Sequence, residues 1–256
     1  MTGNSLVPPE LLDPVVAYFN PRRVILFGSR ARGDAGPDGD IDLLVVVDDD
    51  TPADKVTLRA GRQARSGYHR PADIIPVRED TFRRMCGIPG TLSRAAWLDG
   101  VTVYEQVREE MPEPEPDPVD RHNSVLGWIK IARSDIQVAR ACLEMVPSQP
   151  GVAAYHCQQA AEKALKGFLV LADVDFGKTH DLDGLGASVV AAYPATEPQV
   201  APLGGLTNWG IVYRYPDMPE PPPEPSADEL SSALEQIERL ADALEAEVPP
   251  PALPAR

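Results

Sequence analysis

The stretch that decides the fold of the first half of the chain is Phe27-Gly28-Ser29, followed after ten residues by Asp40-Ile41-Asp42. Each part adjoins an apolar run, RVILF at residues 23–27 and IDLLVVV at residues 41–47. Both runs are rich in aliphatic and β-branched residues and are bounded by turn residues, which is typical of strands. The sequence therefore predicts two strands connected through a glycine turn and a polar loop.

Further elements follow these two strands. Residues 73–77 predict a third strand, which its proline places at a sheet edge or a strand end, and residues 100–104 predict a weaker fourth. Thr51-Pro52 predicts the start of a helix, with Thr51 as its N-cap. The fold class expected for this half is a small α/β domain.

The second half shows helical rather than strand periodicity. A capping box, Ser226-x-x-Glu229, precedes a long apolar stripe, and residues 181–193 and 199–213 predict two further helices, giving a bundle of about five. Earlier apolar residues recur at steps of three and four. They are Leu126, Ile129, Ala132, Ile136, Ala139, Leu143 and Val146 in one predicted helix, and Cys157, Ala161, Ala164, Phe168 and Leu171 in the next.

Proline clusters mark the domain boundaries. The segment MPEPEPDP at residues 111–118 alternates proline with acidic residues and predicts an extended, semi-rigid linker. The expected domains are residues 1–110 and 119–248, with 111–118 as the linker and 249–256 as a flexible tail.

Composition narrows the function classes. The net charge of −15 argues against bulk binding of a nucleic-acid backbone. Residues 1–110 hold 14 Lys and Arg against 17 Asp and Glu, whereas residues 111–256 hold 10 against 22, so the first half is expected to handle anions. Three cysteines without metal-ligand spacing indicate reduced thiols. The absence of a long apolar run and of a basic leader predicts a cytoplasmic protein with no membrane association.

The strand residues carry the chemistry. Gly28 permits close approach of a ligand to the backbone, and the turn after it, with the Ser29 hydroxyl, suits a phosphate oxygen. Strand alternation places the carboxylates of Asp40 and Asp42 on one face, and Asp73 can add a third from the next strand. Like charges this close favour a cation between them, and oxygen ligands favour Mg²⁺ or Mn²⁺. The alternative is an ordinary acidic surface turn, which the joint pattern disfavours.

These residues resemble the nucleotidyltransferase superfamily that includes polymerase beta, most closely its minimal nucleotidyltransferase branch, over about residues 8–108. The resemblance implies an α+β domain with a small mixed sheet, ATP or another NTP as donor, a hydroxyl acceptor and release of pyrophosphate. It implies that Asp40, Asp42 and Asp73 are catalytic, and that Gly28 and Ser29 bind donor phosphates. Asp40 and Asp42 would bind metal, and Asp73 would bind the second metal ion or help to deprotonate the acceptor. Arg30 and Arg32 are expected either to clamp the same phosphates or to be solvated.

The second half resembles a HEPN domain over about residues 120–247, on the motifs of residues 155–166 (YHCQQAAEKALK), 179–182 (THDL) and 213–217 (YRYPD). One face of the first motif, together with an arginine of the third, predicts an anion or nucleotide site, with a structural or dimer-interface role as the alternative. The residues of this possible site are His156, Gln159, Lys163, Lys166 and Arg214. His180 is expected to cap a helix.

Ribonuclease members of the HEPN family carry an Arg-x4–6-His motif. Residues 119–248 contain none, and the one formal match, Arg62 with His69, lies in the other domain, so the sequence argues against ribonuclease activity.

The expected function is therefore metal-dependent transfer of a nucleoside monophosphate, most plausibly AMP from ATP, to a hydroxyl on a protein, RNA or small molecule. The helical half is expected to form a homodimer or to shape the acceptor site. Two alternatives stay open. One is a non-catalytic nucleotide sensor or fused toxin–antitoxin-like regulator, and the other is an aminoglycoside-type nucleotidyltransferase.

Overall fold

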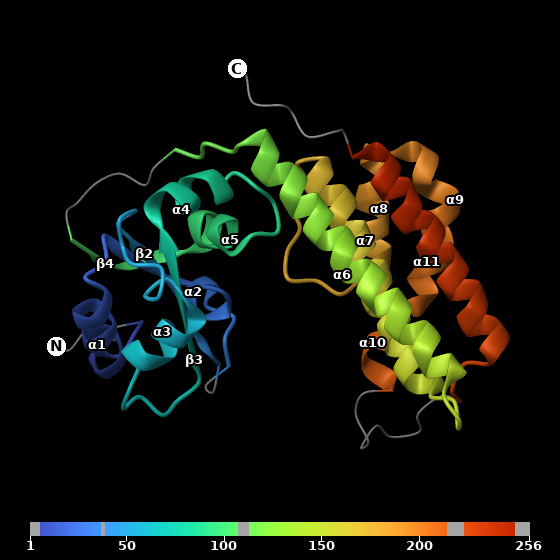
Figure 1. Ribbon diagram of the computed structural model, residues 1–256, viewed down its shortest axis with the longest axis horizontal. Coiled ribbons are helices and arrows are strands. Elements are labelled where there is room, and N and C mark those ends of the chain that lie inside the picture. Colours follow the sequence, from blue (N-terminus) through green and yellow to red (C-terminus); the bar gives the residue numbers. More distant parts are fainter. Residues whose placement is uncertain (1–5, 37–38, 107–112, 214–222, 249–256) are drawn as a thin grey trace. The chain divides into compact units, whose positions relative to one another are not determined.

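The computed structural model describes residues 6–36, 39–106, 113–213 and 223–248 (Figure 1). The chain divides into two compact units, Met1–Asp117 and Pro118–Arg256, here termed the front unit and the helical unit. Each is described by itself. Residues 113–117 of the segment predicted as a linker form no helix or strand, while Pro118 is the first residue of a helix. The rest of that segment, residues 111–112, and the predicted tail, residues 249–256, lie outside the described residues.

The front unit is built on a four-stranded mixed sheet. Its strands occur in the order β3-β2-β1-β4, in which β2 and β3 are parallel and the other pairs are antiparallel. The four predicted strands are confirmed, and Pro76 lies in an edge strand, where a missing backbone donor is tolerated. The strands are β1 (Arg23–Phe27), β2 (Ile41–Val47), β3 (Ala72–Arg78) and β4 (Val101–Glu105).

Strand alternation gives the sheet two apolar faces, each covered by helices (Figure 1). Helices α1 (Pro9–Phe19) and α3 (Leu58–Ala64) cover the face to which Leu43 and Ile74 belong. Helices α4 (Glu79–Met85) and α5 (Leu92–Asp99) supply Phe82 and Ala96 to the opposite face, and Cys86, directly after α4, packs there too. β1 and most of β2 are buried on both faces, which explains their nearly uninterrupted apolar sequences.

The helix predicted to start at Thr51 begins later. Residues 51–57 form turns, and α3 starts after Thr57, whose hydroxyl accepts the Ala60 N–H at 3.1 Å. The Arg78 guanidinium donates to the backbone carbonyls of Asp49 and Thr51, at 3.1 and 2.7 Å. These bonds tie the loop after β2 to the end of β3, and the N-cap role belongs to Thr57.

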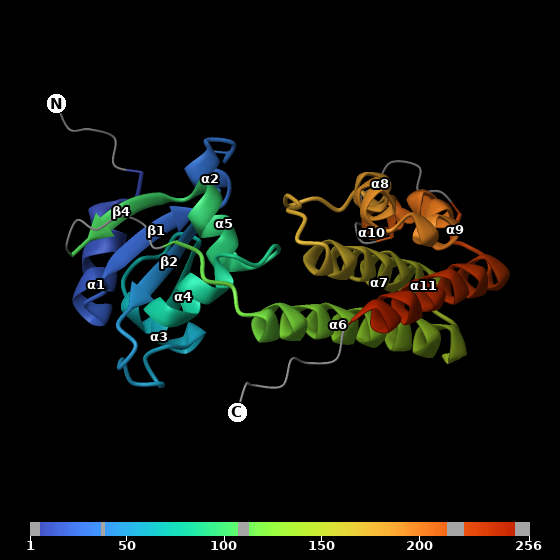
Figure 2. The same ribbon diagram turned by 90° about the horizontal axis from the view of Figure 1, so that it is seen from above.

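The helical unit is arranged around one central helix, α7, whose neighbours include α6, α8, α10 and α11 (Figure 2). Its buried residues include many alanines, and these short side chains allow close packing of neighbouring helices. A Cβ on Gly167 would lie 2.5 Å from Leu244 of α11 and 3.3 Å from Trp128 of α6. The main helices are α6 (Pro118–Glu144), α7 (Pro150–Leu171), α8 (Leu182–Ala192) and α11 (Ala227–Glu247).

Two sequence expectations need correction here. Leu126 and Val146 are exposed, because the buried face of α6 is formed instead through Val125 and Cys142 and the helix ends at Glu144. Residues 199–213 do not form one helix. They form short segments, namely α9 (Glu197–Val200), η2 (Ala201–Leu206) and α10 (Trp209–Val212), preceded by η1 (Pro194–Thr196).

The predicted capping box opens α11. Ser226 and Glu229 exchange both expected hydrogen bonds, the Ser226 N–H donating to the Glu229 carboxylate at 2.8 Å. Ion pairs then link α11 to α6, since Arg140 donates to the Glu238 carboxylate through Nε and Nη2, and Arg133 pairs with Asp242 and Glu245.

Candidate functional site

The glycine at the end of β1 has a backbone conformation that requires glycine. Gly28 has φ 78° and ψ −156°, a region that L-residues with a Cβ essentially do not occupy. It is followed by a single helical turn, α2 (Ser29–Arg32), which ends at Gly33 with φ 81°. The sharp turn thus brings Ser29 directly to the end of the strand.

The sheet register brings this turn and two of the predicted acids to one edge. Phe27, the last residue of β1, pairs with Asp42 of β2, and Asp42 pairs with Asp73 of β3. Alternate residues of a strand lie on the same face of the sheet. Phe27, Leu44 and Ile75 all pack on the face covered by α4 and α5, so Asp42 and Asp73, each two residues before one of the last two, lie on that face as well.

The third predicted acid lies next to this pair in sequence. Asp40 is exposed and precedes β2 directly, whereas Asp42 is half-buried and Asp73 is exposed. Among the described residues, no group of three or more His, Cys, Asp or Glu side chains is arranged to hold a metal ion. The geometry thus brings Asp42 and Asp73 together, while Asp40 stands two residues before Asp42.

The two predicted phosphate-binding arginines make local contacts. Arg30 donates from Nη2 to the Gly39 carbonyl at 2.9 Å, which fixes the loop just before Asp40. Arg32 donates from Nε to the Asp34 carboxylate at 3.2 Å near the surface. Arg30 therefore shapes the approach to β2, and Arg32 already has an acidic partner.

The face predicted as an anion site in the helical unit is an internal polar network. Its centre is Glu162, whose side chain is 1% exposed and accepts bonds from Lys166 at 2.8 Å, Lys163 at 2.9 Å and His180 Nδ1 at 2.8 Å. Burial by itself raises the pKa of Glu162, but the bonds from Lys166, His180 and Lys163 outweigh it and lower the pKa to about 2. Glu162 is therefore charged at neutral pH.

The other members of the predicted face also have partners inside the unit. His156 contacts the Asp135 carboxylate through Nδ1 at 2.8 Å, and Lys163 donates to Gln159 at 3.0 Å. Lys166 is buried and donates to the Thr179 carbonyl at 3.0 Å. Arg214 lies outside the described residues. These hydrogen bonds within the unit thus already use many of the donors and acceptors that were predicted to bind a ligand.

Sequence reasoning missed Glu162 and misassigned His180. Gln158, Glu162 and Lys166 follow one another at steps of four, so they share a helix face, and that spacing could have revealed the acid between them. The N-cap of α8 is Asp181, which accepts the N–H groups of Asp183 and Gly184. The His180 side chain is instead directed to Glu162, so its predicted capping role is wrong.

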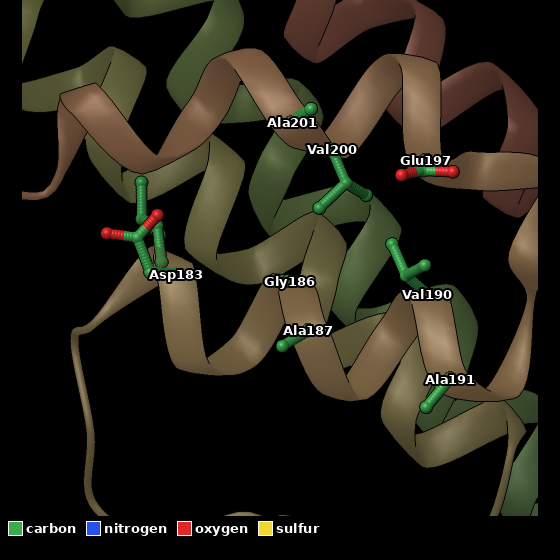
Figure 3. Close-up of a pocket in the computed structure, with 9 residues that line it drawn as sticks. Asp183, Gly186, Ala187, Val190, Ala191, Glu197, Val200 and Ala201 are labelled. Carbon is green, nitrogen blue, oxygen red and sulfur yellow. The ribbon is translucent and has the colours of Figure 1, made fainter.

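A groove on the helical unit has the wrong charge for a phosphate. It has a volume of about 480 Å³ and lies between α8 and the α9–η2 segment. Figure 3 shows the carboxylate of Asp183 towards one end of the groove and that of Glu197 towards the other, with Val200 between them and Val190 across from Glu197. Both charged lining residues are acidic, so the groove itself offers no positive charge to a phosphate.

Fold and site together define a two-domain protein, in which an α/β sheet domain with a glycine turn and paired carboxylates precedes an all-α bundle. Comparison with known families matches a nucleotidyltransferase domain to residues 9–87 and a HEPN domain to residues 125–247. The chain is a nucleotidyltransferase domain followed by a HEPN domain. No curated protein matches it.

The match to a nucleotidyltransferase domain indicates that the protein is a transferase, an enzyme that transfers a nucleoside monophosphate. Of the helices that the structure describes, none combines the length and the apolar character needed to cross a membrane.

Proposed function

We propose that the nucleotidyltransferase domain of the front unit transfers a nucleoside monophosphate to an acceptor hydroxyl with the help of Mg²⁺ or Mn²⁺. The proposed donor is ATP, which supplies AMP. The observation that carries the proposal is the register that pairs Asp42 with Asp73 and sets both beside the end of β1, where the Gly28 turn begins. A phosphate-binding turn and carboxylates at one sheet edge are the two parts that nucleotidyl transfer needs.

The residues present fit a divalent cation. Asp42 and Asp73 are hard oxygen donors on neighbouring strands and on one face, and Asp40 can extend the set from the preceding loop. Two carboxylates held side by side repel each other, and a cation between them removes that cost. When bound, the cation would neutralise charge on the donor phosphates and on the leaving pyrophosphate.

The chain's own groups supply position and proton transfer. The backbone after Gly28 and the Ser29 hydroxyl would hold donor phosphates, because the turn leaves them at the end of a strand buried on both faces. Asp73 is exposed and would accept the proton of the acceptor hydroxyl. Arg30, through its bond to Gly39, would keep the start of β2 in place.

The proposal is tested by transfer of label from α-³²P-ATP, with Mg²⁺ present, to a panel of protein, RNA and small-molecule hydroxyl acceptors, aminoglycosides included. Asp40→Asn combined with Asp42→Asn should abolish the label, whereas Asp54→Asn, an exposed acid on the loop before α3, should retain it. Label that persists in the double variant would contradict the proposal. ATP binding without pyrophosphate release would make the protein a nucleotide sensor instead.

For the helical domain we infer a supporting role without ribonuclease activity. His156 and His180 each have a carboxylate partner within the unit, Asp135 and Glu162, and no arginine precedes either at the ribonuclease spacing. Incubation of the purified protein with labelled total RNA is expected to leave the RNA intact, and cleavage lost in His156→Gln or His180→Gln would overturn this inference.

The same domain is proposed to form a homodimer. Helix α6 exposes Ile131 and Val138, which are seven residues apart and so lie on one side of the helix, and the exposed Met145 follows directly after the helix ends. Sedimentation should give a dimer for the native chain and a monomer for Ile131→Glu. Equal masses for the two would contradict a dimer through this helix.

A further inference from the structure

A small cavity opens beside the starts of β2 and β3, on the face of the sheet opposite Asp42. It has a volume of about 220 Å³. Ile41, which belongs to the core under α1 and α3, forms part of its wall, so strand alternation separates the cavity from the paired carboxylates. The lining residues are Arg30, Gly39, Ile41, Tyr68, Arg70 and Pro71.

The charge of this cavity is positive. Arg30 and Arg70 both line it, and none of the described lining residues is acidic. In an acidic chain this concentration of guanidinium groups is unusual, and it gives the cavity an attraction for anions that the surface as a whole lacks.

One of the two arginines has hydrogen-bonding capacity to spare. Arg30 uses Nη2 on the Gly39 carbonyl, but its Nε is buried and has no partner among the described residues. A buried donor without an acceptor is costly, so the Arg30 guanidinium has donor capacity that the described residues do not use. Arg65 donates to the Arg70 carbonyl at 3.3 Å, which fixes the backbone that carries the second guanidinium.

Size restricts the ligand further. A volume of about 220 Å³ lies below the roughly 300–1,000 Å³ of sites that enclose a drug-sized ligand, so a whole nucleotide does not fit. The lining includes two arginines and a tyrosine, residue types whose N–H and O–H donors suit a tetrahedral oxyanion. We propose that this cavity binds a single phosphate group, as a subsite distinct from the carboxylate edge.

Phosphate binding itself stands apart from the proposed metal chemistry. Only the origin of the phosphate rests on the proposed function, since the group could belong to the NTP donor or to a phosphorylated acceptor. The cavity and Asp42 lie at the same end of β2, so a substrate that spans that end could reach both.

The test is a ³¹P NMR titration of the full chain with inorganic phosphate in the presence of EDTA, which removes divalent cations from the carboxylate edge. Arg70→Gln should weaken phosphate binding by about tenfold or more, because one charge-assisted partner is lost. Tyr68→Phe, which removes only a hydroxyl, should weaken it less. Arg62→Gln, with the same change of charge at an exposed position of α3, should bind phosphate as the native chain does.

The outcomes separate this proposal from the preceding one. Equal affinities for the native chain, Arg70→Gln and Arg62→Gln, or no binding by the native chain, would overturn the phosphate subsite whatever the transfer assay gives. Asp42→Asn should keep its phosphate affinity in EDTA even where it loses transfer. With Mg²⁺ present, weaker ATP binding by Arg70→Gln assigns the phosphate to the donor, and unchanged ATP binding assigns it to the acceptor.

Discussion

Asp42 and Asp73 occupy paired positions in the parallel register of β2 and β3, although thirty residues separate them in the chain. The pairing depends on β3 being parallel to β2, which brings the starts of the two strands to one edge. The antiparallel β1 ends at that same edge, with Gly28 directly after it. The geometry of the proposed site thus follows from strand directions.

Replacement of Gly28 by alanine should destabilise the front unit. The backbone at Gly28 has φ 78° and ψ −156°, and a Cβ in this region costs about 1–3 kcal/mol. The free energy of unfolding from urea denaturation measures this. Gly36→Ala is the matched control, because a Cβ there would meet no heavy atom within 4 Å and its φ is not positive; its change should stay within about 0.5 kcal/mol. Equal effects of the two substitutions would show that the Gly28 turn is not strained.

Replacement of Glu162 by glutamine should destabilise the helical unit far more than loss of a surface acid. The substitution keeps the size of the side chain but leaves the buried Lys166 without its charged partner, which costs about 3–5 kcal/mol. Glu238→Gln removes the partner of the more exposed Arg140 and should cost about 1 kcal/mol or less. Thermal and urea unfolding of both variants give the comparison. If Glu162→Gln lost no more stability than Glu238→Gln, the Glu162 carboxylate would not be the centre of the buried polar network.

The stabilisation that Glu162 contributes should be lost in acid. Its folded-state pKa of about 2 lies below the ordinary value of 4.5, so its stabilisation is complete above pH 4.5 and disappears as the pH falls towards 2. The difference in unfolding free energy between the native chain and Glu162→Gln should therefore include the full contribution of the charged carboxylate at pH 5. It should then shrink by on the order of 3 kcal/mol at lower pH. A difference that does not change down to pH 2 would contradict the low pKa.

The strands and the acidic edge could be predicted from the sequence because both depend on local patterns. Apolar runs define β1 and β2 to the residue, and alternation within a strand fixes which face Asp42 takes. The start of α3 was mispredicted because its loop is held by Arg78 from the end of β3, a contact that local propensity at Thr51 does not encode.

The polar groups of the helical unit could not be assigned from one helix alone. His180 reaches Glu162 from beyond the end of α7, and Asp135 reaches His156 from α6, so their pairing depends on tertiary packing. The Arg70 cavity was missed for the same reason. Arg70 lies in the connection between α3 and β3, and only the fold brings it to the cavity that Arg30 also lines.

The claim that Asp42 and Asp73 together hold a divalent cation is tested most directly by Mn²⁺ binding, which needs no knowledge of the acceptor. The electron paramagnetic resonance signal of free Mn²⁺ is followed during titration with the full chain, with and without ATP. Native protein and the control Asp54→Asn should bind Mn²⁺ alike. Asp42→Asn and Asp73→Asn should each bind it about tenfold or more weakly, since each variant loses one charged ligand. Equal binding by all four proteins would contradict the account.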